Sequence, residues 1–218
     1  MLTLHGVTRS RASRIVWLCH ELDLPFQQRP VIQAYRLADA DAPDAPLNTR
    51  SPEFLALSPA GAIPVIEDDG LILSESLAIT LHLARKHGGD VGPQNYEEDA
   101  LMGQWSFYGA TAIEPDALTI LFLHNRTLAA PEDAGLVAEA AGNLARPLRV
   151  LEDHLATHAY LIGGRFTVAD LNMAEIIRYA AGHTALMEPF PAIRAWLSAC
   201  QDRPAFRAMW AARLAEPE

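Results

Sequence analysis

The spacing of hydrophobic positions divides the chain into two regions, and the first is built from short elements. Residues 2–5 alternate between apolar and polar side chains, which predicts a strand. From Ser10 onward the apolar residues recur at spacings of three and four, which predicts an amphipathic helix. Residues 26–32 predict a second strand. Strand, helix and strand in this order are typical of a right-handed βαβ unit.

A second group of short elements follows a less regular segment. Residues 34–46 are rich in Ala, Asp and Pro and show no periodicity, so we expect a loop there, either a lid over a site or a solvated spacer. Pro52 favours the start of a short helix. The runs 63–66 and 71–73 flank an Asp-Gly turn and predict a hairpin. Ser74 is a good N-cap for a helix that begins at Glu75 and reaches His87.

Beyond a boundary rich in glycine at residues 87–94, only helical patterns are found. We therefore expect a first domain at residues 1–86 with the order βαβ, short helix, ββα, a linker at 87–94 and an all-helical domain at 95–218. The Thr167 to Asp170 segment predicts a capping box. The expected helices span residues 95–125, bent near Pro115, then 134–158, interrupted by Pro147, and then 167–181, 191–200 and 204–214.

Composition and charge narrow the classes of protein that these elements can form. The net charge of −10 argues against nucleic acid or an anionic membrane as the main partner. We expect no signal peptide and no membrane-spanning segment. The two cysteines, Cys19 and Cys200, are too far apart in sequence to suggest a disulfide framework, and together these features predict a cytoplasmic protein.

The segment around the hairpin carries chemistry that suits a peptide-like ligand. Pro64 stands at the start of a strand, and the backbone N–H and C=O of Ile63 are left to pair with an extended ligand. The N–H groups and the Ser76 hydroxyl at the following helix N-terminus suit a carboxylate, and Glu75 suits an ammonium group. This pattern favours a ligand with an α-amino acid at one end. The simpler alternative is a hairpin followed by an ordinary capped helix.

Four segments of the chain carry a family resemblance. They are Ser-Pro-Ala-Gly-Ala-Ile-Pro at 58–64, Glu-Ser at 75–76, Phe-Thr-Val-Ala-Asp at 166–170 and Phe-Pro-Ala-Ile-Arg-Ala-Trp at 190–196. In this order and spacing they resemble the cytosolic glutathione transferases, and the resemblance covers essentially the whole chain. It implies a thioredoxin-like α/β N-terminal domain with a mixed four-stranded sheet, a cis proline at Pro64, an all-α C-terminal domain and a homodimer.

The resemblance implies a set of residues that bind glutathione as co-substrate. The backbone of Ile63, next to Pro64, bonds the cysteinyl part, and Glu75 and Ser76 hold the γ-glutamyl end. Thr49 and Arg50 stand where some members direct a basic residue toward the glycyl carboxylate. An arginine suits that carboxylate because its guanidinium forms two parallel hydrogen bonds. A solvated loop arginine is an equally weighted alternative.

Residues 5–14 resemble the serine-type members, and we expect a bacterial member of that type. Ser10 falls on the catalytic serine, whose hydroxyl donates a hydrogen bond to the glutathione sulfur and favours the thiolate. The alternatives are that Ser10 only caps the first helix, or that Ser13 is the donor. No cysteine stands near Ser10 and Cys19 lies on the apolar helix face, so thiol–disulfide exchange through a protein cysteine is disfavoured.

The electrophile is expected to meet an apolar surface that includes Phe107, Tyr108, Thr111 and Trp210, with Trp105 in the core. His154 and His158 stand four residues apart, as in some metal pairs, but nothing is spaced to complete a site. We interpret both as surface residues and expect no metal. The predicted activity is conjugation of glutathione to a small hydrophobic electrophile. The alternatives are peroxide reduction, isomerisation or ether cleavage with glutathione, or a non-catalytic binding module.

Overall fold

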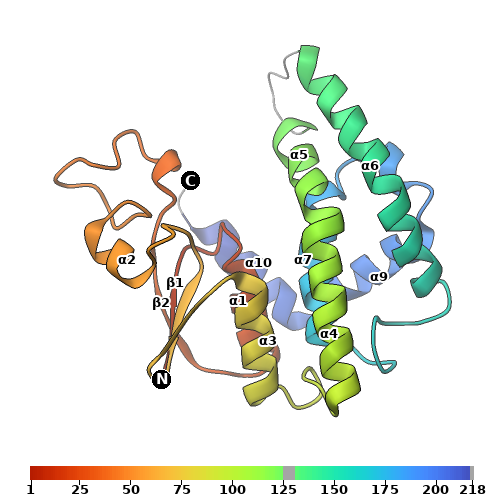
Figure 1. Ribbon diagram of the computed structural model, residues 1–218, viewed down its shortest axis with the longest axis horizontal. Helices are drawn as coiled ribbons and strands as arrows, with labels where there is room; N and C mark the ends of the chain where they lie inside the picture. The colour runs from red at the N-terminus through yellow and green to blue at the C-terminus, as the bar shows by residue number, and fades with distance from the viewer. Residues whose placement is uncertain (125–130, 217–218) are drawn as a thin grey trace. The chain divides into compact units, whose positions relative to one another are not determined.

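The computed structural model describes residues 1–124 and 131–216 (Figure 1). Contacts between residues divide the chain into two compact units. The first unit contains residues 1–88 together with the chain from Pro204 onward, and the second contains residues 89–203. None of the described helices combines the length and the apolar character that a membrane-spanning segment requires.

The first unit is built on a four-stranded mixed sheet, which confirms the predicted fold class. The strand order is β2-β1-β3-β4, in which β1 pairs parallel with β2 and antiparallel with β3. β2 ends earlier than predicted because Pro30 follows it and has no N–H to continue the ladder. The strands are β1 (Leu2–His5), β2 (Phe26–Arg29), β3 (Val65–Asp68) and β4 (Leu71–Ser74).

Helices of the first unit cover both faces of this sheet. α2 (Pro52–Leu57) lies on one side, and α1 (Ser13–Glu21) and α3 (Ser76–His87) lie on the other (Figure 1). The α2 side is closed by a small cluster of Val31, Phe54 and Val65. The segment at 34–46 contains a short 3-10 turn, η1 (Ala34–Arg36).

The last helix, α10 (Pro204–Ala215), packs against α1 inside the first unit. The indole of Trp17 meets the ring of Phe206 edge to face, with centroids 4.9 Å apart. Contacts therefore group α10 with the sheet, whereas the sequence pattern predicts a helical domain that reaches residue 218.

The second unit is helical throughout its regular structure, in keeping with the predicted fold class. α8 is a single short turn of helix that the periodicity did not indicate. The elements are α4 (Tyr96–Tyr108), η2 (Gly109–Ile113), α5 (Glu114–His124), α6 (Pro131–Leu155), α7 (Val168–Ala180), α8 (Thr184–Met187) and α9 (Pro191–Gln201).

Where the sequence predicts a bend near Pro115, the structure has a π-helical segment, η2, that ends two residues before that proline. The Glu114 N–H bonds to the Gly109 carbonyl, five residues back, and Pro115 has no N–H to continue the usual pattern. A Cβ on Gly109 would lie 2.8 Å from Ile176, so η2 approaches α7 closely. The predicted end of this helix at Asn125 lies outside the described residues. Pro147, the predicted interruption, lies inside the continuous α6.

Asp170 is the polar centre of the second unit and confirms the predicted capping box. Its carboxylate accepts hydrogen bonds from the backbone N–H and hydroxyl of Thr167 at 2.9 and 3.1 Å. It also accepts one from Leu161 N–H and one from the Trp196 indole, each at 2.9 Å. Asp170 is fully buried, and the hydrogen bonds of its carboxylate link α7 to α9 and to the loop before α7.

We expect Asp170→Ala to lower the free energy of unfolding by about 3 kcal/mol, because it removes a helix cap and leaves buried donors without an acceptor. Urea unfolding followed by circular dichroism measures the loss. Asn95→Ala is the matched control, since Asn95 caps α4 in an exposed position and its loss should cost about 1 kcal/mol. Equal losses in the two variants would contradict the central role of Asp170.

Candidate functional site

The turn between β1 and α1 lies against the segment that precedes β3. Gly6 has φ +144°, and a Cβ there would lie 3.4 Å from the Cβ atoms of both Ile63 and Ala12. Its N–H bonds to the Arg29 carbonyl at 2.9 Å, which holds the start of the turn on the sheet. Residues with a side chain rarely adopt this φ, so Gly6 allows the chain to turn here, and the turn that carries Ser10 begins next to Ile63.

Ser10 is half-buried in this turn, and its hydroxyl makes two local hydrogen bonds. Ser10 Oγ donates to the Val7 carbonyl at 2.7 Å and accepts from the Ala12 N–H at 3.0 Å. The helix itself begins at Ser13, with Ala12 at the N-cap position. Ser10 is therefore not the N-cap residue, and its hydroxyl instead closes the turn that precedes the helix.

Ser13, the other candidate donor, has a different environment. It is the first residue of α1 and is fully buried. Its backbone N–H bonds to the Ser10 carbonyl at 3.2 Å. The two serines therefore differ in access, since only Ser10 reaches the surface of the unit.

The Ile63–Pro64 peptide bond is cis, as the resemblance implies. The register pairs His5 with Val65, which places this peptide directly beyond the end of β1. Pro64 is buried and Ile63 is partly exposed. Within the described residues, no hydrogen bond joins the Ile63 backbone to another group. Its N–H and C=O are thus open to an extended ligand.

Glu75 takes an unusual backbone conformation at the start of α3. It has φ 67° and ψ 109°, a region that non-glycine residues occupy at a cost of about 1–3 kcal/mol. Glu75 is the N-cap residue, so the prediction of Ser74 in that role is wrong by one position. Its side chain is exposed and forms no ion pair or hydrogen bond with another described residue.

Ser76, next to it, is buried and linked to α1. Its Oγ accepts a hydrogen bond from Arg14 Nη1 at 2.8 Å. The hydroxyl proton of Ser76 can then be donated elsewhere. Arg14, itself buried, is a site residue that the sequence pattern did not indicate. The sequence feature that could have indicated Arg14 is its position four residues before Leu18, on the face of α1 that is otherwise apolar.

Thr49 and Arg50 belong to a loop that Asn48 holds together. The buried Asn48 amide donates to the carbonyls of Ala40 and Pro46, each at 2.9 Å, and its oxygen accepts from Arg50 N–H at 2.8 Å. Thr49 Oγ1 accepts from Ala34 N–H at 3.0 Å. The Arg50 guanidinium is exposed, 3.5 Å from the Asp41 carboxylate. Its charge is therefore accessible on the surface of the first unit.

The residues expected to meet the electrophile fall in both units. Phe107 on α4 is 63% exposed and Thr111 on η2 is also exposed. Tyr108 is half-buried, donates to the Pro147 carbonyl at 3.2 Å, and has its pKa raised by burial. Trp210 on α10, in the first unit, stacks on Phe206 with centroids 5.7 Å apart. Trp105 is buried as predicted.

The cysteine and histidine predictions have different outcomes. Cys19 is buried in the core, and burial raises the pKa of its thiol to about 12, so it is chemically inert. The surface assignment of His154 is wrong, because its ring is half-buried between Trp105 and His158, with centroid distances of 4.9 and 4.4 Å. Across residues 1–124 and 131–216, no group of three metal-ligating side chains comes together.

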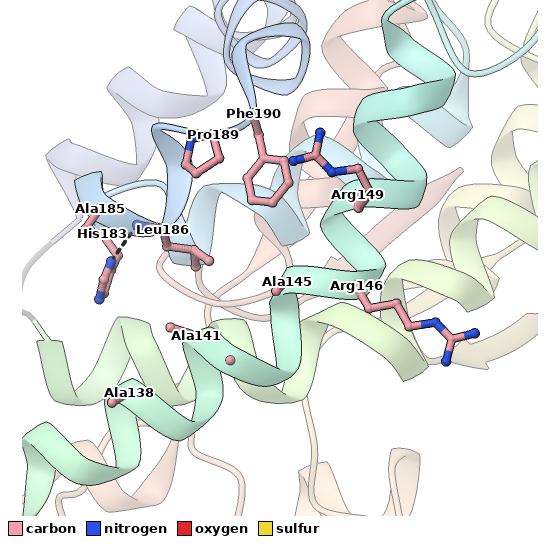
Figure 2. Close-up of a pocket in the computed structure, with 11 residues that line it drawn as sticks. Ala138, Ala141, Ala145, Arg146, Arg149, His183, Ala185, Leu186, Pro189 and Phe190 are labelled. Carbon is pink, nitrogen blue, oxygen red and sulfur yellow. Dashed lines mark hydrogen bonds between the residues drawn. The ribbon is translucent and has the colours of Figure 1, made fainter.

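Two cavities have linings that do not include Ser10. The first, of about 860 Å³ in the second unit, is lined mainly by small and apolar side chains of α6 and the segment at 183–190 (Figure 2). Two of the lining residues also contact each other, since the Arg149 guanidinium lies 5.0 Å from the centre of the Phe190 ring. The second cavity, of about 310 Å³ in the first unit, contains the His5–Glu67 pair at 2.8 Å. Neither cavity is lined by a predicted glutathione residue.

Comparison with known proteins identifies this arrangement of sheet, turn and cis peptide. Residues 4–91 match the family model described as Glutathione S-transferase, N-terminal domain. Residues 102–204 match the model described as Glutathione S-transferase, C-terminal domain. The two matched segments include the predicted glutathione residues and most of the helical region.

Individual relatives agree with the family models. Glutathione S-transferase F13 of Arabidopsis thaliana is 32% identical over 94% of this chain and 93% of its own. The structure of glutathione S-transferase III in apo form has a TM-score of 0.79 and 32% identity, covering 100% of this chain and 99% of that one. The theta class enzyme of Xanthomonas axonopodis pv. citri, with glutathione bound, has a TM-score of 0.78 and 25% identity over 95% of each chain.

The chain therefore belongs to the glutathione S-transferase family and is a glutathione transferase enzyme. The alternatives of a peroxidase, an isomerase, an ether-cleaving enzyme or a binding module are not favoured by these relatives.

The exposed Glu75 carboxylate leads to a binding prediction. Glu75→Ala should weaken glutathione binding by about 1.5–3 kcal/mol, because it removes a charge-assisted hydrogen bond to the ligand ammonium. Isothermal titration calorimetry measures the change. Glu97→Ala, at an exposed glutamate in the first turn of α4, is the control and should bind as the parent does. An unchanged dissociation constant in folded Glu75→Ala would remove Glu75 from the site.

Proposed function

We propose that Ser10 activates the thiol of glutathione for attack on a small hydrophobic electrophile, as a serine-type glutathione transferase does. The observation that carries the proposal is the position of Ser10, half-buried in the turn that Gly6 brings against Ile63. The full burial of Ser13 supports the choice between the two serines.

In this proposal, the γ-glutamyl end of glutathione binds at the start of α3. The Glu75 carboxylate binds the α-ammonium, and the Ser76 hydroxyl donates to the α-carboxylate. Two observations support this: the strained exposed conformation of Glu75, and the Arg14 hydrogen bond that leaves the Ser76 hydroxyl able to donate. The helix N-terminus adds a favourable dipole for the carboxylate.

The middle and the glycyl end of glutathione follow the neighbouring segments. The cysteinyl backbone pairs with the N–H and C=O of Ile63, before Pro64, as an added strand. Arg50, with Thr49 beside it, receives the glycyl carboxylate. The exposed guanidinium of Arg50 supports this role, because its distance of 3.5 Å from the exposed Asp41 makes a weak surface pair that a carboxylate can displace.

Activation requires the Ser10 hydroxyl to exchange one partner. The hydroxyl stops donating its hydrogen bond to the Val7 carbonyl and donates it to the sulfur, while Oγ still accepts the bond from the Ala12 N–H. The pKa of a free thiol is about 8.5, and lowering it by one pH unit requires about 1.4 kcal/mol. One hydrogen bond to a charged sulfur supplies about 1.5–3 kcal/mol, which corresponds to about one to two pH units. The pKa of the bound thiol would then be about 6.5–7.5, so that roughly a quarter to three quarters of the sulfur is thiolate at pH 7.

The electrophile, a small hydrophobic molecule, contacts Phe107, Tyr108, Thr111 and Trp210. The exposed ring of Phe107 supports this role, because it offers apolar surface that a hydrophobic ligand can cover. On family resemblance, the enzyme is a cytoplasmic homodimer that needs glutathione and no metal.

The choice between serines gives the main functional prediction. Ser10→Ala should raise the pKa of the bound glutathione thiol toward about 8.5, and the rate at neutral pH should fall by up to about tenfold for each pH unit by which that pKa rises. Ser13→Ala should leave this pKa unchanged and act on stability only. Ultraviolet thiolate absorbance of the bound complex against pH measures both variants. A raised pKa in Ser13→Ala and an unchanged one in Ser10→Ala would assign the donor to Ser13.

Oligomeric state is a separate prediction. Because the family resemblance implies two subunits, light scattering at micromolar protein concentration should give the mass of a dimer. A monomer mass under those conditions, in protein that still binds glutathione, would rule out the homodimer.

A further inference from the structure

The turn that carries Ser10 is held by a residue that follows α10. The carboxylate of Glu216 accepts hydrogen bonds from the backbone N–H of Thr8 at 2.6 Å and of Arg9 at 2.8 Å. These N–H groups belong to the two residues directly before Ser10. The carboxylate thus binds two adjacent backbone N–H groups of the turn, as anions do in backbone nests.

Two further side chains complete this contact. Arg213, on α10, donates from Nη1 to the Thr8 carbonyl at 2.7 Å, and its own carbonyl accepts from Arg9 Nε at 3.0 Å. Gln28, on β2, donates from Nε2 to the Gly6 carbonyl at 2.9 Å and lies 3.4 Å from the Glu216 carboxylate. We call Arg213 and Glu216 the α10 clamp.

The clamp satisfies backbone groups that the turn cannot satisfy by itself. Thr8 is 1% exposed, so its N–H and C=O need partners within the protein. Both partners come from α10 and the residue after it, more than two hundred positions along the chain. Each of these bonds carries a full charge on one partner, and such bonds are about twice as strong as neutral ones.

We propose that Glu216 and Arg213 are positioning residues for the Ser10 hydroxyl. This inference rests on the proposed role of Ser10. The Arg9 N–H that Glu216 holds belongs to the residue directly before Ser10, so the clamp restrains the backbone from which the hydroxyl extends. A donor must be held within about 0.5 Å of its productive geometry to be effective. The clamp supplies that restraint.

Removal of Glu216 has two opposing effects on the pKa of the bound thiol. Loss of positioning weakens the hydrogen bond from Ser10 to the sulfur and raises the thiol pKa. Loss of a negative charge near the sulfur lowers that pKa. Because two N–H groups at 2.6 and 2.8 Å already compensate the carboxylate charge, we expect the positioning effect to dominate.

The test is a double-mutant cycle on the pKa of bound glutathione, read from thiolate absorbance. The variants are Ser10→Ala, Glu216→Ala and the pair of changes together. Glu216→Ala should raise the pKa by about half a pH unit, which lowers the thiolate fraction at neutral pH up to about threefold. The double variant should titrate as Ser10→Ala does, because a positioning residue has no effect once the hydroxyl is gone.

Two control variants separate positioning from charge and from folding. Glu216→Gln retains a carbonyl oxygen that can accept one of the two N–H bonds, so its pKa should lie between those of the parent and Glu216→Ala. Glu139→Ala makes the same change of charge at an exposed position on α6 and should titrate as the parent does. Thermal unfolding of each variant confirms that the comparison is made on folded enzyme.

Four outcomes would overturn the inference. A fall in pKa for Glu216→Ala would mean that the charge dominates. A rise that persists in the Ser10→Ala background would mean that Glu216 acts without Ser10. An unchanged pKa for Glu216→Ala, with a clear rise for Ser10→Ala, would reject the clamp and leave the role of Ser10 standing. An unchanged pKa for Ser10→Ala would reject both.

Discussion

The antiparallel pairing of β1 with β3 brings together the two segments that we propose to hold the thiol and the peptide part of glutathione. The register sets His5 opposite Val65, so the turn after β1 and the cis peptide before β3 emerge at the same edge of the sheet. Gly6, whose φ of +144° is rarely adopted by residues with a side chain, then allows the chain to turn next to Ile63. The donor proposed for the sulfur and the backbone proposed for the peptide are neighbours because of this pairing.

The parts of the fold that local rules govern could be predicted from the sequence. The hairpin follows from an Asp-Gly pair between two apolar runs, and the capping box follows from Thr167 and Asp170 at the required spacing. The mixed sheet is expected from the resemblance, and the structure confirms it. At the site, the prediction of a cis peptide at Pro64 is also correct.

The features that the sequence does not reveal depend on contacts between distant residues. α10 pairs with α1 through Trp17 and Phe206, and no periodicity in either helix shows its partner. Arg14 and Glu216 each satisfy polar groups in another segment, so their roles become visible only when the chain is folded. The Glu75 conformation is hidden because Ser74 is the better cap by local preference, and tertiary structure overrides that preference.

We propose that the Ser10 hydroxyl changes partner when glutathione binds, from the Val7 carbonyl to the sulfur. A crystal structure of the enzyme with glutathione, at a resolution that fixes the Ser10 side chain, tests it most directly. The account predicts Ser10 Oγ within hydrogen-bonding distance of the sulfur, with the 2.7 Å contact to Val7 lost and the Ala12 contact kept. A bound sulfur that contacts another donor, while Ser10 stays on the Val7 carbonyl, would contradict it.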